Sequence, residues 1–263
     1  MSLVDAISSP RLNTYKTSFN CNFDNDALKY YYWNQAISAE IYVLLHNIEI
    51  CLRNRIHTAL SLNISELNND TLSDNYKWYE FFDFNVPDKD DPTKMVLGET
   101  GKVVASAKRK LSQKRMRKTP QNVISNIDFG AWRHIFQISH CKNGEVIEWD
   151  KINPKIFVHY GDIRNREKRK VVMDRLREIG LLRNRVAHLE PVWKFKERKI
   201  GNRVIAEPSS PTQIFSNLNQ EIAATVRFLG WLCTDTYSFY IKTKSYKNLQ
   251  KLIQHQTIQD FGL

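Results

Sequence analysis

Apolar residues recur at helical spacing along most of the chain, and this pattern predicts an all-α fold. Ser38, for example, can cap a long amphipathic helix that ends near Leu62. We expect about six to eight helices in all. The helical pattern covers residues 24–33, 38–62, 102–118, 120–126, 132–138, 166–188, 214–240 and 245–258.

Four stretches depart from this pattern, and one of them, residues 141–165, is polar and predicted to be irregular. Residues 1–22 resemble an irregular N-terminal arm, and residues 63–101 mix turn-forming residues with an aromatic cluster, which predicts irregular structure with a short helix. Residues 192–208 alternate between apolar and polar, and Gly201-Asn202 can form the turn of a β-hairpin, the only β signal in the chain. We therefore expect one helical domain over residues 23–263, with insertions at 63–101 and 192–211.

Composition indicates a folded protein with a polyanionic partner. Hydrophobic residues make up 42% and aromatic residues 11% of the 263, which suffices for a substantial core. The net charge of +11 favours phosphate-rich partners through counterion release, although an anionic membrane surface or an acidic protein would respond to the same field. No apolar stretch is long enough to span a bilayer, and the N-terminus lacks a secretion signal, so we expect a cytoplasmic protein without a membrane partner.

The basic residues concentrate between 102 and 118, where eight Lys and Arg residues occur without an acidic one. Val104, Leu111 and Met116 can form the inner face of a helix there. A solvated surface helix is the simpler interpretation, but the overall charge leads us to predict a contact with an RNA backbone. The predicted RNA-binding residues are Lys102, Lys108, Arg109, Lys110, Lys114, Arg115, Arg117 and Lys118.

Several classes of chemistry have no support in the sequence. The four cysteines are far apart, without a CxxC pair, so we expect free buried thiols and neither a zinc site nor a disulfide framework. The histidines do not group with carboxylates at metal-ligand spacing, and no phosphate-binding or dinucleotide-binding glycine motif occurs. We therefore expect no metal and no cofactor.

Residues 181–191 (LLRNRVAHLEP) carry the most specific chemistry. Asn184 and His188 are four residues apart and share a helical face, with Arg183 near its edge. Arginine binds phosphate, asparagine orients by hydrogen bonding, and histidine transfers protons near neutral pH. Pro191 limits the helix, which predicts His188 in its last turn. A helical Arg and His are more often solvated or ion-paired than catalytic, and further signals are needed.

One further signal is a near copy upstream. Residues 52–57 read LRNRIH, against LRNRVAH at 182–188. Glu49 lies four residues before Arg53, a spacing that predicts a modest ion pair or support for Arg53 at a substrate. Asn54 and His57 complete a possible second half-site, although only three residues separate this Arg from its His.

The other signal is resemblance. Arg183 to His188 resembles the Arg-x4-His motif of the HEPN superfamily of helical ribonucleases, including the Asn after the Arg. Residues 31–57 (YYWNQAISAEIYVLLHNIEICLRNRIH), 119–136 (TPQNVISNIDFGAWRHIF) and 181–193 (LLRNRVAHLEPVW) resemble, in that order, three blocks of the Abi-like (abortive infection) family of bacterial and phage-defence proteins.

This resemblance implies a HEPN-like helical bundle and a metal-independent endoribonuclease. The RNA 2′-OH would attack the phosphate, with His188 as general acid or base, Arg183 on the scissile phosphate and Asn184 orienting. Because one His does not easily supply both acid and base, we expect either a homodimer that brings two copies of the motif together, ranked first, or a site built from both motifs of one chain. The upstream motif is one residue shorter than usual, which favours a supporting role for it.

Two other functions fit the same sequence. The chain could be a non-catalytic RNA-binding protein that holds a structured or antitoxin-like RNA, or a protein-interaction module whose basic face docks an acidic partner. The family resemblance also implies growth arrest during phage infection, and hence a control element such as a regulatory non-coding RNA or an antitoxin.

Overall fold

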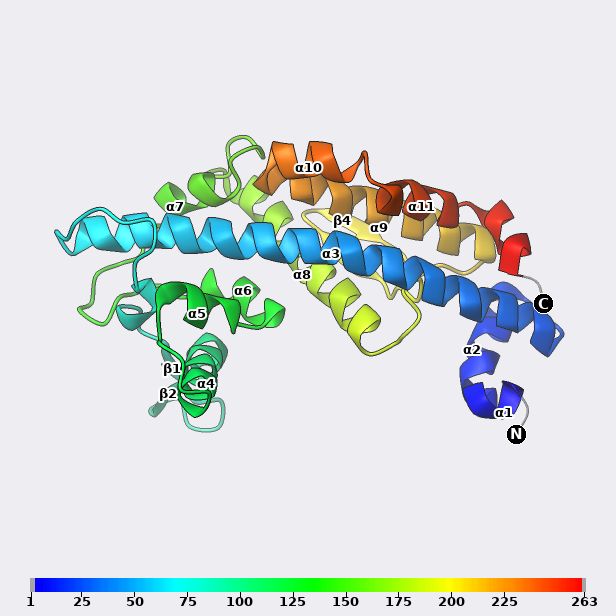
Figure 1. Ribbon diagram of the computed structural model, residues 1–263, viewed down its shortest axis with the longest axis horizontal. Helices are drawn as coiled ribbons and strands as arrows, with labels where there is room; N and C mark the ends of the chain where they lie inside the picture. Colours follow the sequence, from blue (N-terminus) through cyan, green and yellow to red (C-terminus); the bar gives the residue numbers. More distant parts are fainter. Residues whose placement is uncertain (1–2, 262–263) are drawn as a thin grey trace. The chain divides into compact units, whose positions relative to one another are not determined.

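The computed structural model describes residues 3–261, with the side chains of 255–257 left aside, and it is mostly helical (Figure 1). The predicted all-α class is confirmed. The α-helices are α1 (Leu3–Ile7), α2 (Ser9–Phe19), α3 (Asp24–Leu67), α4 (Glu99–Gln113), α5 (Pro120–Ser125), α6 (Phe129–Ile135), α7 (Trp149–Ile156), α8 (Arg166–Ala187), α9 (Pro211–Leu232), α10 (Thr234–Tyr240) and α11 (Lys244–Leu252), and the 3-10 helices are η1 (Trp78–Glu80) and η2 (His255–Phe261).

Two short antiparallel hairpins accompany the helices. The predicted one is formed by β3 (Arg198–Ile200) and β4 (Arg203–Ile205), with Gly201 at φ +59 in the turn. The second, β1 (Asn85–Pro87) with β2 (Met95–Leu97), lies in residues 63–101, for which we predicted irregular structure and a short helix. All of its strand residues are exposed, so they lack the alternation of buried and exposed positions by which a sequence reveals a strand.

The described chain divides into two compact units, one of residues 1–48 with 170–263 and one of residues 49–169. Both units are mainly helical, and the long helices α3 and α8 cross the boundary in sequence. The expectation of a single domain over residues 23–263 stays a prediction.

In the first unit, the prediction of an irregular arm at the N-terminus is wrong. Helix α2 buries Leu12, Tyr15 and Phe19, and the Phe19 ring stacks on Tyr30 of α3 at 3.9 Å between centroids. These apolar residues recur at three- and four-residue spacing, so α2 is an amphipathic helix whose short length hid it. The arm is therefore part of the core.

Helix α11 lies along the N-terminal half of α3 (Figure 1). The Trp33 indole donates to the Leu252 carbonyl at 2.7 Å, and Glu40 accepts from Ser245 and Asn248. The predicted break before Ser38 is absent, because the Ser38 hydroxyl donates to the Asn34 carbonyl at 2.6 Å inside one continuous helix. Helix α3 is thus longer than the sequence suggested.

In the second unit, α4 packs against α5 and α6. Helix α4 buries Val104 and Leu111 as predicted, but it ends at Gln113, and Met116 is exposed, contrary to prediction. The cause is Arg115, which takes a left-handed backbone at φ +53 and turns the chain out of the helix. Helix α5 starts as predicted, with Thr119 capping the Asn122 amide.

Candidate functional site

The C-terminal end of α8 fixes the position of the predicted catalytic histidine. Helix α8 ends at Ala187, and Leu189 adopts a left-handed backbone at φ +58. The Leu189 amide donates to the Val186 carbonyl, and the Glu190 amide donates to the Arg185 carbonyl at 2.8 Å. These two bonds form a Schellman cap, so His188 is the first residue after the helix and not part of its last turn, one residue later than predicted, and its side chain is exposed.

A cavity of about 610 Å³ opens beside this helix end. Asn184 and His188 both line it, so the structure brings these two predicted residues together. Arg183 does not line it, because one residue before Asn184 the side chain points to a different side of α8. Arg183 is half-buried, and no ion pair found within residues 3–261 includes it. The complete lining is Arg177, Glu178, Leu181, Leu182, Asn184, Arg185, His188, Glu190, Phe195, Lys196, Glu197, Arg198, Lys199 and Glu221.

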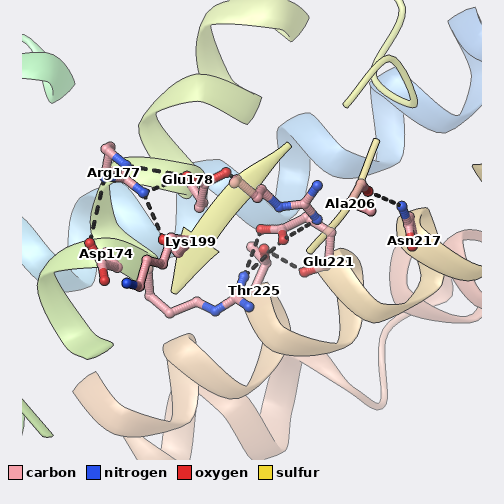
Figure 2. Close-up of polar contacts among 10 residues, drawn as sticks. Asp174, Arg177, Glu178, Lys199, Ala206, Asn217, Glu221 and Thr225 are labelled. Carbon is pink, nitrogen blue, oxygen red and sulfur yellow. Dashed lines mark hydrogen bonds and ion pairs between the residues drawn. The ribbon is translucent and has the colours of Figure 1, made fainter. Parts of the chain in front are cut away.

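A buried network of charged side chains holds the wall opposite α8 (Figure 2). Arg198 of β3 approaches a Glu221 oxygen at 3.2 Å through Nη2 and a Glu178 oxygen at 3.5 Å through Nε. Arg175 Nη1 donates to both oxygens of Glu221, at 3.0 and 2.8 Å. The side chains of Glu221 and Arg198 are only 2% and 7% exposed, so their charges depend on this pairing.

Arg177 fastens the hairpin to α8, as Figure 2 shows. Its Nη2 donates to the Lys199 carbonyl at 2.9 Å, and its guanidinium pairs with Glu178 and Asp174. Asp174 in turn accepts from the Gly201 amide at 2.8 Å. The hairpin is therefore held at a fixed place beside the cavity.

The sequence analysis did not single out the other charged residues of this cavity. Arg185, Arg198, Glu178 and Glu221 come from three separate segments, and their pairing depends on tertiary contacts that local spacing does not reveal. The sequence offers only a weak signal for this pairing. Glu178 and Glu221 are buried in helices whose other buried residues are mainly apolar, and a carboxylate at such a position needs a charged partner.

The chain after the motif is anchored by α2 and α3. The Trp193 ring contacts Tyr15 and Phe19 at 5.5 and 4.7 Å between centroids, and the Val192 amide donates to the Asn34 side chain at 3.0 Å. The N-terminal helices thus hold the segment that follows His188.

The upstream motif has a different environment. The Trp78 indole donates to His57 Nδ1 at 3.0 Å, and His57 Nε2 lies 3.0 Å from Asn75 Oδ1, to which it must donate. Burial lowers the pKa of His57 below its ordinary value. Both ring nitrogens of a neutral His57 are therefore used in holding residues 75–78.

The other upstream residues take no part in this cluster. Arg53 is half-buried and Asn54 is exposed. In the described structure no ion pair joins Glu49 to Arg53, so the predicted intrahelical pair is not formed.

The basic segment divides into two groups. Lys108 is half-buried, pairs with Glu80 at 2.6 Å and lies 5.1 Å from the centre of the Tyr79 ring, while Lys102 pairs with Glu99. The remaining six are exposed and have no ion pair within residues 3–261: Arg109, Lys110, Lys114, Arg115, Arg117 and Lys118. This second group presents its charge to solvent.

Metal-binding and membrane-spanning features are absent from the part of the chain that the structure describes. No group of His, Cys, Asp and Glu among these residues is arranged to hold a metal ion. The cysteines are thiols outside any disulfide, but only Cys141 is buried, so the prediction of buried thiols is wrong for Cys21, Cys51 and Cys233. No described helix has the length and apolar character needed to cross a bilayer.

Comparison with known proteins identifies a family. A model of the Abi-like protein family matches residues 3–194, well over half of the chain, and this range includes both Arg-Asn motifs. No curated protein and no solved structure matches significantly.

Proposed function

Because the chain belongs to the Abi-like family, we propose that it acts in abortive infection, a form of phage defence, as a metal-independent endoribonuclease of the HEPN type. The observation that carries the proposal is the shared position of Asn184 and His188 on an arginine-lined cavity at the end of α8. Exposed histidine next to guanidinium groups is suited to proton transfer at a phosphate.

The chemistry needs no group beyond the RNA and the protein. The RNA 2′-oxygen attacks the adjacent phosphorus, and a general base takes the 2′ proton. The bond from phosphorus to the 5′-oxygen breaks, and a general acid gives that oxygen a proton. The products are a 2′,3′-cyclic phosphate and a 5′-OH end. His188 transfers a proton, Arg183 stabilises the charge on the phosphate, and Asn184 orients the phosphate or the imidazole.

A second copy of the chain supplies what one motif lacks. One His188 does not serve easily as acid and base in the same step, and Arg183 and His188 lie on different sides of α8. A symmetric homodimer would bring two motifs together. The occupied ring nitrogens of His57 favour this arrangement over one that uses the upstream motif for catalysis. Leu181 and Leu189, 47% and 73% exposed beside the motif, offer apolar surface for such a contact.

The exposed basic group from Arg109 to Lys118 binds the RNA backbone in this proposal. Its contribution is independent of sequence and depends on salt, as expected for phosphate contacts. The same surface would serve a non-catalytic protein that retains a regulatory RNA. A nuclease that arrests growth needs restraint, so we also propose a regulatory RNA or an antitoxin as a partner.

Cleavage by purified protein tests the proposal. Wild-type protein should cut RNA in the presence of a chelator and leave cyclic-phosphate ends. His188→Ala should reduce the rate by about 10²–10⁴, because it removes a positioned proton donor or acceptor, while RNA binding persists. His46→Ala removes an exposed histidine of α3 outside the cavity and is the matched control. Binding without cleavage in the wild type would favour the RNA-retaining alternative.

Mixing experiments test the homodimer. If both His188 side chains serve one site, a ninefold excess of His188→Ala protein, co-refolded with the wild type, should lower the wild-type activity about tenfold, because wild-type pairs become rare. An excess of His46→Ala protein should not lower it. Activity that is indifferent to His188→Ala protein would exclude the shared site.

A further inference from the structure

Arg185 stands out among the charged residues of the cavity. It is half-buried and lines the cavity, yet no ion pair found among residues 3–261 includes it. Its Nη1 is buried without a hydrogen-bond partner, and its guanidinium lies 5.4 Å from the centre of the Phe195 ring. Burial lowers the pKa of Arg185 below its ordinary value, which reflects an environment that disfavours the cation.

A second guanidinium approaches the same ring. The Arg198 guanidinium lies 4.3 Å from the centre of the Phe195 ring. The Arg198 side chain is only 7% exposed, and its Nη1 is buried without a hydrogen-bond partner. Its charge and those of Arg175 and Arg177 are matched by the three carboxylates of the network, Asp174, Glu178 and Glu221. Arg185 is therefore an additional positive charge beside a network that is already neutral.

Such an arrangement destabilises the unliganded protein. A buried N–H without an acceptor loses its hydration without replacement, and two guanidiniums on one ring repel each other. Of the other charged lining residues, the cations Lys196 and Lys199 are matched in number by the carboxylates Glu190 and Glu197, so the one positive charge that Arg185 adds stays in excess. Glu190 favours the Arg185 cation electrostatically but forms no ion pair with it among the described residues. An anion in the cavity would relieve this imbalance. Arginine is suited to phosphate because its planar donors match the phosphate oxygens in pairs.

We propose that this cavity binds the phosphate group of a nucleotide, with Arg185 as its direct ligand and Arg198 as the charge behind it. The inference rests on the proposed ribonuclease function in one respect: the nucleotide is assigned to the RNA strand that His188 cuts. The volume of about 610 Å³ falls in the range of pockets that hold small ligands. The cavity is thus a subsite that positions the strand next to Asn184 and His188.

Titration with inorganic phosphate tests the site without RNA. Calorimetry at constant ionic strength should detect binding to the wild type, and Arg185→Met should weaken it about tenfold or more, since a hydrogen bond to a charged group is removed. Arg203→Met removes an exposed arginine of the same hairpin outside this cavity and should bind phosphate like the wild type. Without phosphate, Arg185→Met should melt at the same temperature as the wild type or higher, a result that a purely structural arginine would not give.

Glu190→Gln provides an independent test of the phosphate site if Arg185→Met does not fold. Removing this carboxylate from the wall should strengthen phosphate binding, because it repels the ligand. Phosphate affinity that is unchanged in both Glu190→Gln and a folded Arg185→Met would overturn the proposal. So would the absence of phosphate binding by the wild type.

Two nucleotide probes distinguish the source of the phosphate. The first is adenosine 3′-monophosphate, and the second is a short 2′-O-methyl oligoribonucleotide that resists cleavage. Competition between them at an Arg185-dependent site supports the RNA strand. Binding of the mononucleotide without competition would assign the cavity to a free nucleotide and overturn its place in the substrate site. If the protein binds phosphate but cuts no RNA, the proposed ribonuclease activity is refuted and the proposed phosphate site stands. If the protein cuts RNA but its phosphate binding does not depend on Arg185, the proposed phosphate site is refuted and the ribonuclease activity stands.

Discussion

Replacing His57 by alanine should separate its structural role from any role in catalysis. The change removes the acceptor of the Trp78 indole, whose side chain is fully buried, and the donor to Asn75. An unsatisfied buried donor costs about 1–3 kcal/mol, and the missing neutral hydrogen bond adds about 0.5–1.5 kcal/mol. His57→Ala should therefore lower the free energy of unfolding by about 2–4 kcal/mol.

Urea unfolding and RNA cleavage should be measured on the same preparations. At a temperature where the variant is folded, cleavage should stay near the wild-type rate, because both ring nitrogens of His57 are already used in the fold. His46→Ala, a loss of exposed imidazole from the same helix, should change stability by less than about 0.5 kcal/mol. Full stability of His57→Ala with abolished cleavage would refute the structural assignment and favour a site built from both motifs.

A double-mutant cycle isolates the indole contact. Trp78→Phe removes the indole N–H that donates a hydrogen bond to His57. His57→Ala should therefore destabilise this variant less than it destabilises the wild type. Additive effects of the two changes would mean that the hydrogen bond contributes little.

Three other outcomes are expected. Burial holds the pKa of His57 below 6.5, so as the pH falls the unfolded chain takes up a proton on this residue before the folded protein does. The stability advantage of the wild type over His57→Ala should therefore be present above pH 6.5 and decrease as the pH falls. Urea unfolding midpoints measured at several pH values would show this decrease. Leu189→Gly should raise stability by about 1 kcal/mol, seen as a higher melting temperature, because Leu189 holds a left-handed backbone with its side chain exposed. Exchange of four members of the exposed basic group for Gln should reduce the dependence of log affinity for single-stranded RNA on log salt by about 0.7 for each phosphate that is no longer neutralised. The four exchanged residues are Lys114, Arg115, Arg117 and Lys118. Lys108→Gln should change this dependence little, because Lys108 is paired with Glu80.

The parts of the fold that sequence predicts are those with a local cause. Thr119 caps the Asn122 amide because the cap lies three residues away, and Gly201 supplies the positive φ of its hairpin. Asn184 and His188 share the cavity because helical geometry alone puts them one turn apart.

The rest depends on contacts between distant segments. Arg198 meets Glu221 only after the hairpin folds onto α8 and α9, and nothing in the 22 intervening residues specifies that contact. The spacing of the upstream motif makes His57 a candidate for catalysis, whereas its hydrogen bonds to Asn75 and Trp78 make it a structural residue. Arg183 stands in the same short motif as His188 but on another side of the helix. A motif gives residue types, and helical geometry together with the packing of distant segments decides which of their side chains face the same cavity.

The family match ends at residue 194, and the part of the cavity lining that lies opposite α8 begins at Phe195. The helix that carries Asn184 and His188 is thus inherited with the family, while the strand and the glutamate that face it come from the chain beyond the shared block. Mutations in those later residues can alter which ligand is accepted without touching the motif. We therefore expect relatives to diverge in selectivity faster than in chemistry, and a comparison confined to the shared block would miss the change.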